Sequence, residues 1–350
     1  MRNQSTTFRR LAKPALENAR LSGGPALLIM SAMEAPPPLP PRNPAWIIFF
    51  GTIIANAVGG ALLGAVMWFV DAHRNEDAAA FLAWPSFFLL PFLVGLIAAW
   101  IWRRLNRTLG WSFLDALWVT LAGLAAAAVV LREGVVCLVI VSPALYVFIL
   151  CGVLLGRIWF RPNYSNLSLT IFPLLVLVTA TESLYHSEEQ AIVTDRILIH
   201  ASPAKIWPHV LAFPDIPDPP DYWIFRLGLP YPTTTTNGGN FVGADRQCTF
   251  SNGVVINERV AELVPNEKLT FDVAKQPTDP EAYGHITLHR GQFVLQDNHD
   301  GTTTLIGSSW YTLHVRPRWY FNLWTRDMTR AVHLRVMNHV RRLSEEPVQP

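Results

Sequence analysis

The sequence predicts two structurally different parts: an α-helical transmembrane bundle, and an α+β domain whose antiparallel sheet wraps a long C-terminal helix. Two observations lead to this fold class. Charged side chains make up only 15% of the chain, against roughly 25% in ordinary soluble proteins. Of the 28 basic and 26 acidic residues, only 12 lie within residues 45–181, whereas the residues that follow show the alternation of strands and the periodicity of a helix.

Residues 1–44 are expected to form a cytoplasmic, disordered, proline-rich segment. The run Ala35–Pro41 reads as an extended linker. The segment lacks the apolar core and cleavage site of a secretory signal peptide. Met30 and Met33 both precede the linker, so a start at either would leave residues 1–32 out of the natural product.

Residues 45–186 are expected to form the transmembrane region. A bilayer core about 30 Å thick takes roughly 20 apolar helical residues to cross. Runs with at most one charge predict spans at about 45–70, 78–102, 111–131, 134–156 and 167–184. The last run is short and contains Pro173, so the count is four or five spans. Gly60 and Gly64 form a small-xxx-small pair that would suit close helix contact.

The distribution of Lys and Arg predicts the topology, because these residues are retained on the cytoplasmic side. There are six before residue 45, one in 71–77, three in 103–110, one in 132–133 and two in 157–161. This alternation places the N-terminus inside. The expected location is a bacterial inner (cytoplasmic) membrane, with the C-terminal domain outside if the fifth span crosses and cytoplasmic otherwise.

Residues 188–345 are expected to form the α+β domain. Alternating apolar residues predict a strand at Ala191–Ile199, and Ser202-Pro203 begins a helix that extends to Phe213. Turn signals separate further strands at about 247–250, 254–263, 269–275, 291–296 and 302–315, and a long helix follows at 318–343. This order of elements is that of the helix-grip fold.

Several stretches of this domain resemble the SRPBCC superfamily, which includes polyketide cyclase/dehydrase, START, lipid-transfer and birch-pollen-allergen-like proteins. The stretches are Ile199–Trp207, Trp223–Pro232, Trp310-Tyr311, Leu323-Trp324 and Val332–Val340. The resemblance covers about residues 190–345, and none is found for residues 1–189. It implies a helix-grip fold that binds apolar molecules between sheet and long helix. Only some branches of the superfamily are enzymes, so a reaction is implied weakly.

The long helix suggests candidate ligand contacts. At 100° per residue, Arg335 and His339 fall within its apolar face. A buried arginine is costly unless it is paired, so one hypothesis is that Arg335 holds the anionic head group of an apolar ligand. In the alternative, the helix end is exposed, Arg335 extends into solvent and His339 bonds a carbonyl. The remaining candidate contacts are Trp324, Met328, Trp310, Tyr311, Phe293, Phe271, Phe250 and Tyr231.

Other site classes find no support in the sequence. His285 and His289 on an extended segment would lie about 13 Å apart, so no metal is expected, and no cofactor motif is present. The G-x-S-x-G elbow is missing and neither Ser251 nor Ser308 lies in a nucleophile motif, which argues against a serine hydrolase. Glu258 is expected to face solvent. A net charge of +2 gives no basic field for nucleic acid.

The sequence therefore favours a membrane-anchored protein that binds a lipid or other apolar small molecule between the sheet and the C-terminal helix. Its expected partners are the bilayer and that molecule. No paired acid and base stands at recognisable spacing, which favours binding over catalysis and leaves no catalytic residue to name. The alternatives are a polyketide cyclase or aromatase-like enzyme, and a sensory or assembly protein whose soluble domain contacts another membrane protein.

Reporter fusions after Pro44 and after Pro350 test the topology. With five spans, the first fusion reports the cytoplasm and the second reports the outside, because an odd number of crossings separates them. Two cytoplasmic reports would show that residues 167–184 do not cross. An external report after Pro44 would contradict the predicted orientation.

Overall fold

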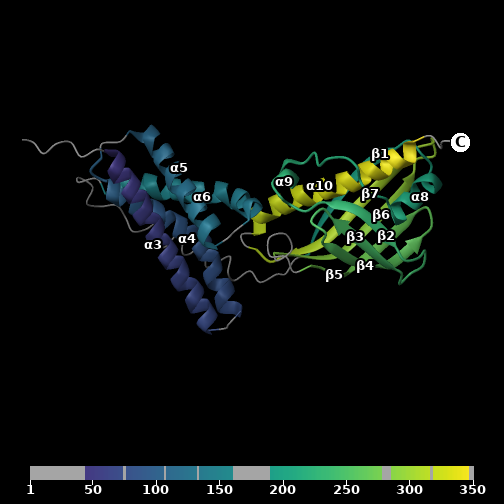
Figure 1. The fold of residues 1–350 in the computed structure, drawn as a ribbon, viewed down its shortest axis with the longest axis horizontal. Coiled ribbons are helices and arrows are strands. Elements are labelled where there is room, and N and C mark those ends of the chain that lie inside the picture. Colours follow the sequence, from purple (N-terminus) through teal and green to yellow (C-terminus); the bar gives the residue numbers. More distant parts are fainter. Residues whose placement is uncertain are drawn as a thin grey trace, which may run out of the picture. The chain divides into compact units, whose positions relative to one another are not determined.

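The computed structural model describes residues 44–73, 76–105, 108–131, 134–160, 190–277, 285–315 and 318–346. Within these ranges the chain forms an N-terminal helical region and a C-terminal α+β domain (Figure 1). The fifth predicted span, 167–184, lies outside the described residues.

The N-terminal region consists of apolar helices at the positions predicted for the first four spans. They are α3 (Pro44–His73), α4 (Glu76–Trp102), α5 (Leu109–Ala126) with its π-helical continuation η1 (Ala127–Leu131), and α6 (Val135–Trp159). Three segments of the described chain, Ala45–Ala65, Leu109–Val130 and Val135–Trp159, are long and apolar enough to cross a membrane. Helix α4 contributes a shorter apolar segment, Phe88–Trp102.

Helices α4 and α6 approach each other closely through two glycines. A β-carbon on Gly95 would overlap the carbonyl oxygen of Ile149, and one on Gly152 would overlap that of Phe92. Only glycine fits at both positions, which is the usual means of close backbone contact between apolar helices. The predicted small-residue pair does not serve this purpose, since a β-carbon at Gly60 or Gly64 would meet nothing within 4 Å.

The C-terminal domain is a seven-stranded antiparallel sheet with a long helix along it (Figure 1). Its elements are β1 (Ala191–Ile199), α8 (Pro203–Leu211), α9 (Trp223–Arg226), β2 (Pro232–Asn237), β3 (Asp245–Phe250), β4 (Val255–Val264), β5 (Lys268–Lys275), β6 (Ile286–Asp297), β7 (Thr303–Leu313) and α10 (Arg318–Glu345). The strand order is β1-β7-β6-β5-β4-β3-β2. Strands β2 to β7 form a meander and β1 pairs with β7, which confirms the predicted helix-grip fold.

Two differences from the predicted elements have simple causes. Strand β2 was not predicted, because Pro232-Thr-Thr-Thr-Thr-Asn237 has prolines before it and no apolar alternation. It lies at the sheet edge, where proline is tolerated since no ladder hydrogen bond is lost. Helix α8 ends at Leu211 rather than at residue 213, and Phe213 instead forms an isolated bridge with Thr235.

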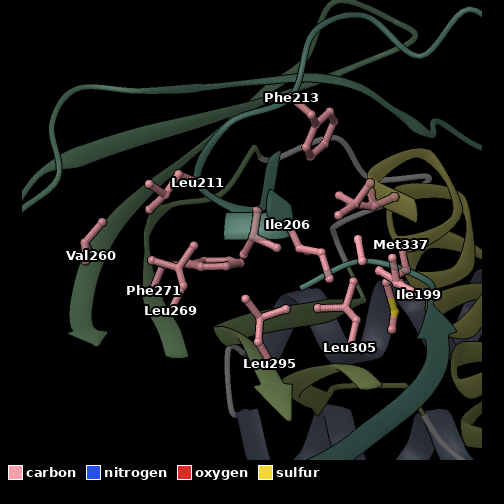
Figure 2. Close-up of a cluster of buried hydrophobic side chains, with 14 of the residues drawn as sticks. Ile199, Ile206, Leu211, Phe213, Val260, Leu269, Phe271, Leu295, Leu305 and Met337 are labelled. Atoms are coloured by element: carbon pink, nitrogen blue, oxygen red, sulfur yellow. The ribbon is translucent and has the colours of Figure 1, made fainter. Parts of the chain in front are cut away.

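The core lies between the inner face of the sheet and the two helices α8 and α10 (Figure 2). Ile206 on α8, Leu269 on β5, Leu305 on β7 and Met337 on α10 are all 0% exposed. Met337 fits here because the strand position beneath it is Gly307, where a β-carbon would lie 3.0 Å from the methionine sulfur. Alternate residues of each strand point toward these helices, so strand parity decides which side chains can line a site between the sheet and α10.

A fragment of residues 188–350 is predicted to fold without the transmembrane region. Sheet and helices form a complete pair of layers with a core of their own. The purified fragment should be soluble and should unfold in one cooperative transition, followed by circular dichroism during heating. An aggregated or structureless fragment would contradict this prediction.

Candidate functional site

A cavity of about 120 Å³ lies between the inner face of the sheet and α10. Its walls are mostly aromatic and aliphatic: Phe250, Ile256, Phe271, Phe293 and Val336 are among the lining residues. Enclosed apolar cavities on the order of 150 Å³ admit a molecule as large as benzene. The space is therefore suited to a small apolar group.

A buried ion pair forms part of the cavity wall. Arg246 on β3 and Glu258 on β4 are directly opposite in the strand register, and the guanidinium donates to the carboxylate. Their exposed fractions are 3% and 7%. Arg246 also donates from Nε to the carbonyl oxygen of Leu211 at 3.3 Å, and its guanidinium lies 4.5 Å from the ring centroid of Phe271.

The expectation that Glu258 faces solvent is wrong. Strand β4 places Glu258 on the same face as Ile256 and Val260, which are both core residues. Burial raises the pKa of the Glu258 carboxyl, while Arg246 beside it acts in the opposite direction. An uncompensated charge would be very costly here, so the pair stays together as one nearly neutral polar group.

A second polar group joins α10 to strands β1 and β7. Nδ1 of His333 lies 2.9 Å from Oδ2 of Asp195, and Nε2 lies 2.8 Å from Oγ of Ser309. The other carboxylate oxygen of Asp195 is 3.4 Å from Nε of Arg330. Ser309 and His333 both line the cavity.

The hydrogen bonds of His333 define its tautomer. An ionised carboxylate only accepts hydrogen bonds, so Nδ1 carries the proton that is donated to Asp195. Nε2 is then an acceptor, and the Ser309 hydroxyl donates to it. Burial lowers the pKa of His333 below its ordinary value of 6.5, and Asp195 acts in the opposite direction. A neutral imidazole at physiological pH agrees with this assignment.

The cavity also contains one cysteine. Cys248 lies on β3 between Arg246 and Phe250 and faces the same space. Burial, reinforced by the charge of Glu258, raises the pKa of its thiol to about 12. Because the thiolate is the reactive form, Cys248 acts here as an apolar wall residue rather than as a nucleophile.

The structure places the predicted aromatic contacts in different environments. Phe250, Phe271 and Phe293 line the cavity together. Tyr311 is 0% exposed, belongs to a separate cluster of buried residues, and donates its hydroxyl to Oδ1 of Asn322 at 2.6 Å. Trp310 has the opposite strand parity to Ser309 and Tyr311, so it faces away from α10.

The other two contacts predicted on the helix do not line this cavity. Trp324 and Met328 are half-buried residues in the N-terminal half of α10. The part of α10 that reaches the cavity comes later, at Val332, His333 and Val336.

Arg335 joins α10 to the first residue of β2 and to the loop before it. Its guanidinium donates to the carbonyl oxygens of Pro232 at 3.1 Å and Asp218 at 2.9 Å, and lies 4.5 Å from the ring centroid of Tyr231. Neither Arg335 nor Tyr231 is among the residues that line the cavity. The guanidinium that was predicted to hold a ligand head group is therefore already hydrogen-bonded to main-chain carbonyls.

His339 lies one turn further along α10. It is 4% exposed, its ring packs edge-on against Phe213, and its Nδ1 accepts a hydrogen bond from Arg342 at 2.8 Å. Burial, followed by the charge of Arg342, lowers the pKa of His339. His339 thus belongs to the packing of the helix against the loop rather than to the cavity wall.

Asp195, Ser309, His333, Arg246 and Glu258 were not predicted as site residues. No motif connects them, because they come from four different strands and one helix. Weak signals exist. Asp195 shares strand parity with the buried Val193 and Ile199.

The helix residue carries a similar signal. His333 stands four residues before Met337, on the buried side of α10. In both cases a polar side chain occupies a position that the periodicity assigns to the core.

Comparisons with known proteins give similarities of fold. No family model matches the chain, and no curated protein sequence matches it. Among solved structures, a protein of Nitrosospira multiformis is 16% identical, covering 43% of this chain and 94% of its own, with a TM-score of 0.31. Truncated norcoclaurine synthase from Thalictrum flavum is 12% identical, covering 46% of this chain and 97% of its own, with a TM-score of 0.33.

A third solved structure is the di-domain ARO/CYC protein BexL from the BE-7585A biosynthetic pathway. It is 14% identical, and the match covers 51% of this chain and 61% of BexL, with a TM-score of 0.33. Matches with identities and TM-scores this low assign no activity to this chain.

Replacing Arg335 by Met is predicted to destabilise the domain. The carbonyls of Pro232 and Asp218 would lose their donors, at a cost of about 1–2 kcal/mol. At roughly 2–4 °C per kcal/mol, Tm should fall by about 2–8 °C in thermal unfolding of the full chain. The control is Arg341→Met at an exposed position of the same helix, which should change Tm little. An unchanged Tm with weakened ligand binding would instead support the head-group hypothesis.

Proposed function

We propose that the protein is a membrane-anchored member of the SRPBCC superfamily that binds a small apolar molecule between the sheet and α10. The observation that carries this proposal is the cavity itself: phenyl and aliphatic walls with a few convergent polar groups are typical of small-molecule sites. The resemblance of residues 190–345 to that superfamily points the same way.

The helical region supports the anchoring part of the proposal. Its described helices are long and apolar, and three segments reach spanning length. The scarcity of charge within residues 45–181 fits a scaffold or anchor. We propose that the bilayer of a bacterial inner membrane is the first partner of the protein, and that the apolar ligand is the second.

The polar wall suggests the chemistry of the ligand. Arg246 is already neutralised by Glu258, and the carbonyl of Leu211 occupies another of its donors. An additional carboxylate on the ligand would compete with Glu258, whereas a neutral carbonyl or hydroxyl can accept from a free guanidinium N–H without charge imbalance. The favoured ligand therefore has an apolar body and one uncharged polar group.

A larger side chain on β5 that fills part of the cavity tests this function. Val273 lines the cavity, so Val273→Phe should occupy part of its volume. Val294→Phe is the matched control, because Val294 lies between the inward-facing Phe293 and Leu295 of β6 and points away from α10. Both substitutions add the same atoms to a strand.

The measurement uses the full chain, extracted from membranes with a styrene–maleic acid polymer so that no detergent enters the cavity. Mass spectrometry should detect an apolar compound released on denaturation of the unmodified protein and of Val294→Phe. Val273→Phe should release about one tenth as much or less. Equal amounts from both variants, or none from the unmodified protein, would contradict the proposal.

A further inference from the structure

We infer that Ser309, His333 and Asp195 form a nucleophilic acyl-transfer centre in the cavity wall, and that its substrate is a small, uncharged, apolar ester. The inference rests on the proposed function in one respect, because the same cavity must admit the substrate. It goes further by naming a reaction, and the residues that perform it.

The geometry is that of a nucleophile, a base and an orienting acid. Ser309 Oγ is 2.8 Å from His333 Nε2, and His333 Nδ1 is 2.9 Å from Asp195 Oδ2. Both distances lie within the range required for proton transfer and for orientation of the base. Three elements hold the groups in place, since Asp195 is on β1, Ser309 on β7 and His333 on α10.

The surroundings orient the carboxylate and keep the imidazole neutral. Asp195 has a side chain only 10% exposed, and its two carboxylate oxygens face two residues of α10, His333 at 2.9 Å and Arg330 at 3.4 Å. His333 is 7% exposed and is kept neutral by burial, so its Nε2 lone pair is free to accept a proton. The oriented imidazole then acts as a general base toward the serine hydroxyl.

The position of the serine distinguishes this group from an ordinary structural tie. The preceding residue, Ser308, also has a side-chain partner, Thr194 Oγ1 at 2.9 Å. That pair has neither a base nor a carboxylate. Ser308 is itself among the residues that line the cavity, but its opposite strand parity turns the hydroxyl away from α10 and toward Thr194. Ser309 and His333 both line the cavity, where a bound carbonyl carbon can approach the hydroxyl.

The reaction follows from these positions. The oxygen of Ser309 forms a bond to the ester carbonyl carbon as its proton moves to Nε2 of His333. The tetrahedral intermediate collapses and the bond to the alkoxy group breaks, while His333 returns the proton to the leaving oxygen as an alcohol. Water then attacks the acylated serine by the same route, which releases the carboxylic acid and restores the hydroxyl.

Covalent labelling with a small dialkyl fluorophosphate tests the centre in the full chain extracted with polymer. Ser309 should form an oxygen–phosphorus bond with loss of fluoride, adding one dialkyl phosphoryl group to the peptide that contains residues 303–313. Ser309→Ala should remain unlabelled, and the matched control Ser308→Ala should label as the unmodified protein does. Failure of the unmodified protein to label at Ser309 would overturn the inference.

The role of the base is tested by rates. His333→Gln and Asp195→Asn should label at least about a hundredfold more slowly, because general-base assistance contributes roughly 10²–10⁴. Hydrolysis of p-nitrophenyl butyrate should fall by a similar factor. Thermal unfolding identifies any variant that fails to fold. If His333→Gln or Asp195→Asn fails to fold, the test rests on the labelling of Ser309→Ala against the unmodified protein, because this substitution removes only a single oxygen. Equal labelling of folded His333→Gln and unmodified protein would reduce the group to a structural tie.

The two proposals fail in different ways. If Ser309→Ala loses labelling but releases the same apolar compound as the unmodified protein, both stand. If Ser309 labels normally but no compound is released by the unmodified protein, the reaction centre stands and stable ligand binding does not. If the compound is released but Ser309 stays unlabelled, the domain binds without catalysing this reaction.

Discussion

The packing of α10 along the inner face of the sheet is the constraint on which the rest of the domain depends. Met337 and Val340 are at most 1% exposed, and Gly307 leaves room beneath Met337. A β-carbon at residue 307 would lie 3.0 Å from the sulfur of Met337, so the methionine side chain would have to shift by a few tenths of an ångström. Close contact near Met337 fixes the height of α10 above the sheet, and the cavity forms toward β3, β4 and β5, where Phe250, Ile256 and Phe271 line it.

Polar groups at the cavity divide into two systems with different physical roles. Arg246 and Glu258 are cross-strand neighbours on the sheet, so they neutralise each other whatever the helix does. Asp195, His333 and Ser309 are joined only because α10 is in place, since His333 is the link between β1 and β7. The first system sets the polarity of the wall, whereas the second depends on the docking of the helix.

Much of the fold could be predicted from the sequence, because fold class depends on periodicity over many residues. Alternation and turn residues predicted the order of strands and helix, and the lack of charge predicted the apolar helices α3 to α6 of the described chain. Strand β2 was missed since Pro232–Asn237 has no apolar alternation, and its strand character comes only from pairing with β3. Tertiary pairing of this kind leaves no local signal.

The site was less predictable, because its members meet only through the tertiary structure. Helical periodicity predicted Arg335 on the apolar face of α10. The residue is half-buried, and the main-chain carbonyls that its guanidinium bonds belong to residues 218 and 232, which no helical pattern could indicate. Phe250, Phe271 and Phe293 were recognised as candidate contacts since large aromatic residues on strands usually face a core. Asp195 and His333, 138 residues apart, were not connected by any motif.

Strand parity decides which of two adjacent serines has its hydroxyl beside the imidazole of His333. Ser308 and Ser309 are equivalent in composition and nearly so in local sequence, and neither lies in a recognised nucleophile motif. A shift of one residue along β7 would exchange their faces, pairing Ser309 with a threonine and turning Ser308 toward the helix. What fixes the register is the neighbouring pattern of Leu305, Gly307 and Tyr311, which must face α10 to complete the core. The hydrophobic residues that hold the helix on the sheet therefore also determine which hydroxyl meets the imidazole.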